Sequence, residues 1–274
     1  MFRVAKHLLR EFTKASAAND TVDVSEADGV RSLHLGSVTI QSAMRIRDPF
    51  ALELAYTRGI MCFLLFKQNV NHMLTIGLGG GSVAKYVHAN CSDIASTIIE
   101  INPRIIQVAR SQFYVPENDE RFEVIEGDGL HYLAEHTADA EVLLIDAFDR
   151  NGIPSDFCSQ DFFDQCATTL KQDGVFVINL WGSDKNFDVY LRRIEQSFDG
   201  RVLVLPTGKP GNIVVFGFKR EPSDLRLNHL RDRAKLLEKT HQIEFLQFIE
   251  KLAEHNPSSS NRLFLNRSLV QTEI

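Results

Sequence analysis

The middle of the chain alternates short apolar runs with amphipathic stretches, and this alternation constrains the fold most strongly. The apolar runs that follow residue 71 are HMLTIG, ASTIIEI, RFEVIEG, AEVLLIDAFD and GVFVINLW. Each has the length and composition of a buried strand, and a helical pattern follows it. Alternating strands and helices predict a mostly parallel sheet that helices cover on both faces.

Two further apolar runs close this region. RVLVLP and NIVVFGF are joined by the turn-rich segment TGKPGN and not by a helix. Such a connection predicts an antiparallel pair at one edge of the sheet. Five parallel strands plus this pair make the seven-stranded, Rossmann-like sheet of class I methyltransferases, so we expect an α/β fold of that class.

The segments on either side differ in pattern. Residues 1–60 contain the alternating run TVDVSEADGVRSLHLGSVTIQSAMRI, which predicts a small β-rich cap followed by a connecting helix. Residues 220–274 contain the run DLRLNHLRDRAKLLEKTHQIEFLQFIEKLAEH, which predicts a long amphipathic helix. We therefore expect three units, with the Rossmann-like, nucleoside-binding domain at residues 61–219 between the other two.

Composition limits the partners. The formal net charge is −6, with 30 Lys and Arg against 36 Asp and Glu, so the basic surface typical of nucleic-acid binding is not expected. No run reaches the ~18 apolar residues of a membrane span. The cysteines, Cys62, Cys91, Cys158 and Cys166, form no CxxC pair and no cluster with histidine at metal spacing. We expect reduced thiols in a cytoplasmic protein without a metal, a nucleic-acid partner or a membrane anchor.

In sheets of this kind ligands bind outside the carboxyl ends of the strands. The first strand ends in GLGGGS, where Gly77, Gly79, Gly80 and Gly81 let the backbone approach a ligand at the start of a helix. A purely structural turn would use glycine as well. Glu100 ends the second strand, about 20 residues later, where an acid can accept hydrogen bonds from both ribose hydroxyls. The alternative for Glu100 is a solvated carboxylate.

The third and fourth strands also end in carboxylates. Asp128 stands between Gly127 and Gly129, where it can accept from the exocyclic amine of adenine while the nearby backbone contacts the ring. A plain turn explains the same residues. Asp146 and Asp149 follow the fourth strand in DAFDRNGIP, and this pair suits a cationic substrate. One of the two can take a proton from an ammonium group, whereas an Asx turn with a solvated second Asp is the alternative.

The run TIGLGGGS, IIEINPRIIQVAR, VIEGDG, LLIDAFD and GIP resembles the spermidine synthase family of polyamine aminopropyltransferases in order and spacing. The segment GSVTIQSA resembles part of that family's N-terminal domain. The resemblance covers about residues 22–218 and implies a small β-domain, a seven-stranded Rossmann-like domain and a homodimer or higher oligomer. It also implies an adenosyl donor that carries a sulfonium and a small-molecule amine as acceptor.

The resemblance carries residue roles with it. By position, Gln41 would hold the tail of the donor, Glu100 the ribose and Asp128 the adenine. The glycine loop and the glycine after Asp128 would let the backbone contact the nucleoside. Asp146 would deprotonate the attacking amine, and Asp149 would bind the far cationic end of the acceptor.

The chain also departs from the family's pattern. The family's glycine loop has an Asp that attracts the donor's ammonium group, and this chain has Gly80 there. Thr57 follows Tyr56 where the family has a Tyr–Gln pair, and Arg150 replaces a proline. Gly208 stands where the family has a substrate-pocket tyrosine. The nucleoside half of the pattern is kept, and the amine half is changed.

We therefore expect a transferase that uses decarboxylated S-adenosylmethionine or S-adenosylmethionine itself, with aminopropyl transfer favoured over methyl transfer. A catalytically altered homologue that only binds a nucleoside, or assembles through its C-terminal helix, is the second hypothesis. A nicotinamide oxidoreductase is the third, but its GxGxxG motif needs Gly or Ala where Ser82 stands. It also leaves the pair Asp146 and Asp149 unexplained.

Overall fold

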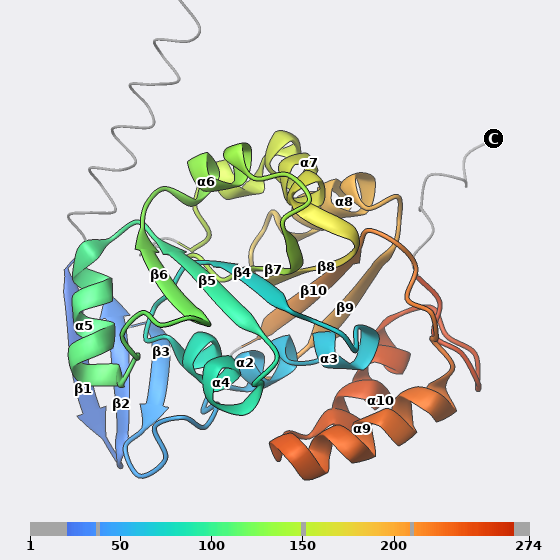
Figure 1. Ribbon diagram of the computed structural model, residues 1–274. Coiled ribbons are helices and arrows are strands. Elements are labelled where there is room, and N and C mark those ends of the chain that lie inside the picture. The colour runs from blue at the N-terminus through green and yellow to red at the C-terminus, as the bar shows by residue number, and fades with distance from the viewer. Residues whose placement is uncertain (1–20, 37–38, 149–151, 209–210, 266–274) are drawn as a thin grey trace, which may run out of the picture.

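The computed structural model describes residues 21–36, 39–148, 152–208 and 211–265, which form two sheets flanked by helices (Figure 1). The smaller sheet is antiparallel and contains β1 (Val22–Ala27), β2 (Val30–Leu35) and β3 (Ile40–Arg45). Asp28 and Gly29 join the first two strands with positive φ angles of 53° and 75°, as a two-residue type I′ turn requires. The predicted β-rich N-terminal segment is confirmed.

The larger sheet has seven strands in the order β6-β5-β4-β7-β8-β10-β9. In chain order they are β4 (His72–Ile76), β5 (Ala95–Glu100), β6 (Phe122–Glu126), β7 (Ala140–Ile145), β8 (Leu170–Trp181), β9 (Val202–Pro206) and β10 (Asn212–Phe218). The first five are parallel, and β10 pairs antiparallel with β8 and β9. The predicted fold class is confirmed. The strand order reverses at β4, so the carboxyl ends of β4, β5 and β7 form the switch point at which ligands bind in such sheets.

Helices cover both faces of this sheet. They are α2 (Ala55–Ile60), α3 (Phe63–Phe66), α4 (Ser82–Asn90), α5 (Pro103–Phe113), α6 (Gly129–Glu135), α7 (Gln160–Thr169), α8 (Phe187–Ser197), α9 (Leu227–His241) and α10 (Phe245–His255), with a 3₁₀ helix η1 at Ser155–Cys158. One face packs its apolar side chains against α2, α3, α9 and α10, and the other packs against α6, α7 and α8.

The small sheet packs against α5 and the start of α4. Leu33 and Met44 of the small sheet share one buried cluster with Ala84 of α4 and Phe113 of α5. This packing places β3 beside the loop that follows β4. The two sheets therefore meet where the sequence predicts a ligand.

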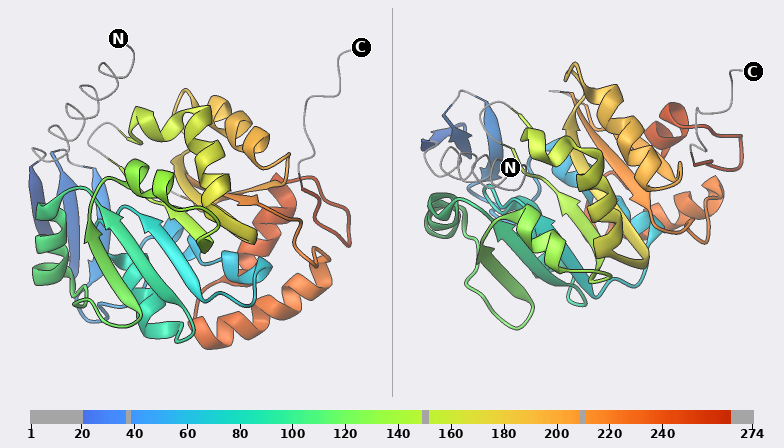
Figure 2. Two further views of the ribbon diagram at one scale, coloured as in Figure 1. Left: turned by 45° about the horizontal axis from the view of Figure 1, so that its top comes forward. Right: turned by 90° about the horizontal axis from the view of Figure 1, so that it is seen from above.

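The predicted helical C-terminal extension is confirmed, but it consists of two helices and not of one long helix. Gln242 ends α9 in the left-handed conformation, with φ of 54°, and its N–H bonds to the carbonyl of Glu238 at 2.8 Å. The chain then begins α10, whose Phe245 and Phe248 are fully buried. Figure 2 shows both helices at the end of the molecule opposite the small sheet.

Candidate active site

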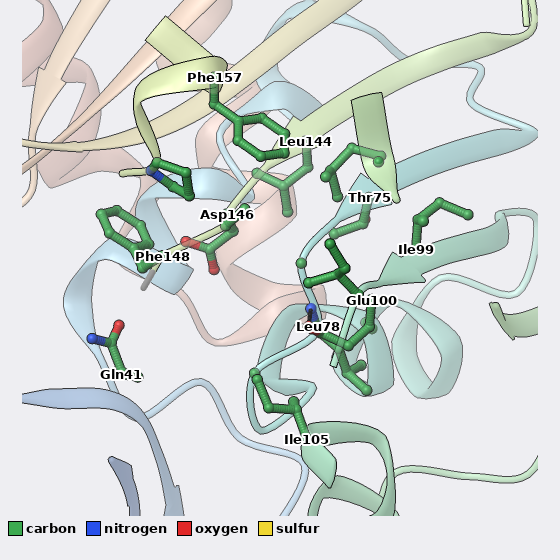
Figure 3. A pocket seen from close by; sticks show the side chains of 18 of the residues that line it. Gln41, Thr75, Leu78, Ile99, Glu100, Ile105, Leu144, Asp146, Phe148 and Phe157 are labelled. Carbon is green, nitrogen blue, oxygen red and sulfur yellow. Dashed lines mark hydrogen bonds between the residues drawn. The ribbon is translucent and has the colours of Figure 1, made fainter. Parts of the chain in front are cut away.

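A cavity lies at the carboxyl ends of the parallel strands, between the large sheet and β3 (Figure 3). Most of its lining is apolar, as in other small-molecule sites. The predicted site residues that line it are Gln41, Gly77, Gly79, Glu100, Asp128, Gly129 and Asp146. Gly81 does not line it, and Asp149 lies outside the described residues. Strand-end residues far apart in the sequence thus share one space, as predicted.

The glycine loop between β4 and α4 depends on left-handed backbone conformations. Gly77, Gly79 and Gly81 have φ angles of 96°, 54° and 66°. A Cβ atom on Gly77 would lie 2.5 Å from the carbonyl oxygen of Asp146, so glycine lets the loops after β4 and β7 meet. A Cβ on Gly79 would meet nothing closer than 3.8 Å, which leaves the backbone there open to a ligand.

Gly81 is explained by packing. It is the N-cap residue of α4, and a Cβ there would approach Val115 Cγ2 to 2.3 Å. Gly129 has a similar constraint, since its Cβ would lie 2.4 Å from Ile76 Cγ2. The predicted contacts of these two glycines with a nucleoside stay predictions, because packing alone requires glycine at both positions.

Glu100 ends β5 and is 5 % exposed. Its Oε2 accepts the N–H of Leu78, and its Oε1 accepts the N–H of Asn102, both at 2.9 Å. Burial raises the pKa of Glu100, and these backbone hydrogen bonds act in the opposite direction. Each carboxylate oxygen has a second lone pair. The backbone N–H groups of Gly79 and Ile101 also lower the pKa of Glu100, so the predicted contact of this carboxylate with two ribose hydroxyls stays a prediction.

Asp128 is the N-cap of α6, and its Oδ1 accepts the N–H of Leu130 at 3.0 Å. The cap satisfies a helix-end donor and fixes the side chain in the lining of the cavity. Gln41 comes from β3. Its Nε2 is buried and has no hydrogen-bond partner among the described residues. Figure 3 shows the side chains of Gln41 and Asp146 directed into the same space, so the Gln41 amide is available to a ligand.

Asp146 directly follows β7 and is held by the side chain of Asn179. Its Oδ1 accepts Asn179 Nδ2 at 3.0 Å. The Tyr56 hydroxyl of α2 lies near the carboxylate and donates to the backbone carbonyl oxygen of Gln41 at 3.3 Å. Burial raises the pKa of Asp146 to about 6, and Asn179 and Tyr56 limit that rise. A carboxylate with this pKa is charged at neutral pH and is more basic than an exposed Asp, which suits a general base.

Several lining residues were not predicted from the sequence. Tyr56 was noted only as part of an altered pair, and its contact with Asp146 depends on how α2 packs on the sheet. Phe148 lines the cavity and stacks on Trp181 with ring centroids 5.6 Å apart. The sequence signal that could have identified Phe148 is its position between two predicted site residues, Asp146 and Asp149. Phe157 adds a second aromatic wall.

The described part of the chain contains no cluster of three or more His, Cys, Asp or Glu arranged to hold a metal ion. Its four cysteines are not disulfide-bonded, and Cys62, Cys158 and Cys166 are buried. Among the described helices, none is long and apolar enough to cross a membrane.

Comparison with known proteins adds family and fold. Residues 53–220 match the spermine/spermidine synthase domain. The chain is 39% identical to a polyamine aminopropyltransferase of Chromobacterium violaceum over 93% of this chain and 98% of that protein. It is 36% identical to a polyamine aminopropyltransferase of Neisseria meningitidis serogroup A over 96% of this chain and all of that protein.

Solved structures share the fold at lower identity. A spermidine synthase in complex with the transition-state analogue AdoDATO has a TM-score of 0.66 and 20% identity, with 86% of each chain covered. Human methyltransferase-like protein 13, in complex with SAH, has a TM-score of 0.63 and 24% identity over 69% of this chain and 93% of that one. The extent of the sequence matches and the strand order together show that the chain belongs to the spermine/spermidine synthase family.

Proposed function

We propose that this protein transfers the aminopropyl group of decarboxylated S-adenosylmethionine to a polyamine-type amine. The observation that carries the proposal is the half-buried Asp146 carboxylate, which shares one cavity with Glu100 and the glycine loop. The names of the Chromobacterium and Neisseria relatives, which align with nearly the whole chain, support the same reaction. The adenosyl compound is a substrate here, and the proposal includes no metal.

The proposed reaction is an in-line displacement. The acceptor nitrogen forms a bond to the aminopropyl carbon next to sulfur while the carbon–sulfur bond breaks. The electron pair of that bond moves to sulfur, which releases methylthioadenosine, and the proton of the nitrogen passes to Asp146. The protein's main contribution is to align the nitrogen, the carbon and the leaving sulfur. Proton removal by Asp146 adds to that effect.

Binding of the donor involves the other strand ends. We assign the ribose to Glu100, the adenine to Asp128 and the donor's tail to Gln41, whose amide has both a donor and an acceptor end. The open backbone at Gly79 contacts the nucleoside. Asp149 is assigned to the far ammonium group of the acceptor, and this role rests on the resemblance alone.

Asp146→Asn tests the function. The substitution keeps the shape of the side chain and removes the base, so transfer should fall by roughly 10²–10⁴ while donor binding survives. Transfer is measured by the formation of methylthioadenosine from decarboxylated S-adenosylmethionine and a diamine. Asp188→Asn, at an exposed position of α8, is the matched control. A parallel loss of binding and rate in Asp146→Asn would make Asp146 a binding residue instead.

Methyl transfer is not favoured as the activity. The human methyltransferase-like protein shares the fold with this chain, but the relatives that align over nearly its whole length are named aminopropyltransferases. A homologue that only binds a nucleoside is disfavoured as well, because the Asp146 carboxylate is hydrogen-bonded and basic. Use of intact S-adenosylmethionine as a ligand stays a prediction and is argued below.

Assembly, location and domain boundaries also stay predictions. We propose a homodimer in the cytoplasm on the basis of the family resemblance. We also propose the division of the chain into residues 1–60, 61–219 and 220–274. Light scattering coupled to gel filtration measures the mass in solution, and a monomer at micromolar concentration would contradict the dimer.

A further inference from the structure

A row of polar side chains crosses the carboxyl end of the large sheet, on the face that α2 covers. Asp146 follows β7, Asn179 lies near the end of β8, and Asn212 begins β10. These strands are neighbours in the sheet. Two positions farther into β8 and β10, on the same face, stand the buried apolar residues Val177 and Val214. Beside the cavity, polar side chains therefore occupy positions that buried apolar side chains occupy farther along the same face.

The hydrogen bonds in this row all point toward Asp146. Asn212 Nδ2 donates to Asn179 Oδ1 at 2.9 Å, and Asn179 Nδ2 donates to Asp146 Oδ1 at 3.0 Å. Because Asn179 Oδ1 already accepts from Asn212, the amide cannot turn over without losing both bonds. Thr207 holds the backbone of Asn212 in place, because its N–H and hydroxyl both donate to the Asn212 backbone carbonyl oxygen at 3.0 Å.

Both side-chain amides in this row are buried. Asn179 is 2 % exposed and Asn212 is 7 % exposed. Buried amides are unfavourable unless they are hydrogen-bonded, and apolar side chains would fill the same space without that requirement. Asn256 is also 7 % exposed, but its amide bonds to the backbone of Val204 and so joins α10 to β9. The bonds of Asn179 and Asn212 lead to the carboxylate of the active site.

We propose that Asn179 and Asn212 are positioning residues that keep Asp146 charged and turned toward the acceptor amine. This inference rests on the role of Asp146 in the proposed function. The N–H of Asn179 occupies one carboxylate oxygen, which orients the group. It also stabilises the charged form of Asp146, which burial disfavours. Asn212 keeps the donor end of the Asn179 amide toward Asp146.

Other titratable groups also surround the cavity. Tyr56 of α2 is in contact with Asp146. Glu100 of β5, Asp128 at the start of α6 and Asp156 of η1 line the same space. All of these groups remain in variants of Asn179 and Asn212, so a change in the pKa of Asp146 reports the loss of the amide donor.

The test is the pH dependence of kcat/KM for aminopropyl transfer. Loss of one hydrogen bond to the charged carboxylate in Asn179→Leu should move the acid limb upward by about one pH unit. Asn212→Leu should move it less, in the same direction. Asn179→Asp should move it most, because two carboxyl groups at hydrogen-bond distance share a proton. Asn256→Ala is the matched control and should lower stability without moving the limb.

A second readout does not need turnover. Carbon-13 NMR of carboxyl-labelled aspartate follows the titration of Asp146 directly, and the signal is identified by its loss in Asp146→Asn. The same order of shifts is expected there, and it would support the positioning role even if the native protein transferred no aminopropyl group. An unmoved titration in Asn179→Leu, with activity reduced equally at every pH, would overturn the proposal. If Asn179→Leu does not fold, the isosteric Asn179→Asp decides between these results.

Discussion

The Glu100 carboxylate holds the glycine loop and is also the proposed hydrogen-bond acceptor for the ribose. The sequence predicted the second of these roles from the place of Glu100 at the end of a strand. The hydrogen bonds to Leu78 and Asn102 could not be predicted, because they depend on how the glycine loop folds back over β5. A substitution at Glu100 is therefore expected to change the stability of the fold as well as ligand binding.

Glu100→Ala is expected to weaken methylthioadenosine binding at least about tenfold, since charge-assisted hydrogen bonds of roughly 1.5–3 kcal/mol each are lost. The melting temperature should also fall, because two buried N–H groups lose their acceptor. Calorimetric titration on protein shown to be folded by circular dichroism measures the first effect. Glu126→Ala is the control, because Glu126 is the register partner of Glu100 on β6 and is exposed. Unchanged affinity in folded Glu100→Ala would remove Glu100 from the site.

The sequence predicted part of the site because the carboxyl ends of parallel strands meet at one edge. That rule brings Glu100, Asp128 and Asp146 into one cavity without any knowledge of side-chain packing. Tyr56 and Asn179 escaped prediction, since their contacts with Asp146 depend on helix packing and on the register of β7 against β8. Neither leaves a periodic signal in the sequence.

At the scale of elements, strands and their order followed from the sequence, whereas helix ends did not. The strand–turn–strand pattern after α8 predicted the antiparallel edge correctly. The break between α9 and α10 was missed because Gln242, unlike glycine, carries no sequence signal for a left-handed conformation. The amphipathic pattern continues across the break. Such a pattern predicts which residues are buried better than it predicts the length of a helix.

We expect the glycine loop to influence which donor binds. Gly80 stands where the family resemblance implies a carboxylate. We therefore expect native protein to bind intact S-adenosylmethionine measurably and to discriminate poorly against it, since no like charge repels its extra carboxylate. A Cβ on Gly80 would lie 2.7 Å from Ser42 Oγ and 2.9 Å from Phe113 Cδ1. Gly80→Asp should therefore lower stability, and any gain in preference for the decarboxylated donor requires these neighbours to shift.

Gly80→Ala is the matched control for that experiment, since it introduces the same Cβ without a charge. The difference between Gly80→Asp and Gly80→Ala, titrated with both donors, isolates the effect of the carboxylate. A strong preference of the native protein for the decarboxylated donor would show that another residue selects it.

Lys85 connects α4 to α5 from a buried position. It is 1 % exposed, its Nζ donates to the carbonyl of Phe113 at 2.6 Å, and burial lowers its pKa from 10.5 to about 8. Between these values the unfolded chain binds more protons than the folded one, so stability rises with pH. The free energy of unfolding should increase by up to about 3 kcal/mol from pH 8 to 10.5, relative to Lys85→Met.

Urea unfolding at several pH values measures this difference. Lys239→Met, on an exposed part of α9, is the control and should follow the native pH dependence. Parallel curves for native protein and Lys85→Met would show that the folded-state pKa of Lys85 is not depressed.

At the scale of the whole molecule, the C-terminal helices are part of the core. Phe245, Phe248, Ile249 and Leu252 of α10 are buried in the cluster that contains α2 and α3. Arg58 of α2 donates to Glu244, just before α10, at 2.9 Å. The two helices therefore support the segment that carries Tyr56.

A chain that ends at Lys219 should be insoluble or unfolded. Each buried side chain of α10 contributes roughly 1.5–3 kcal/mol, so their combined loss exceeds the stability of a typical domain once α9 is counted too. A chain that ends at Leu265 loses no contact that the structure describes and is the control. Solubility and circular dichroism of both truncated chains show whether the chain folds without α9 and α10. A folded, soluble chain 1–219 would show that the C-terminal unit is separable.

The contact of Ser42 and Phe113 with Gly80 also constrains how this protein could change during evolution. The three residues belong to the small sheet, to α5 and to the glycine loop, and the first two fill the space that a side chain at position 80 needs. A lineage that gains a carboxylate there must first make room at Ser42 or Phe113, so the order of substitutions matters. We therefore expect donor choice to be inherited with the packing between the two sheets, and we expect that a single replacement at position 80 does not reverse it.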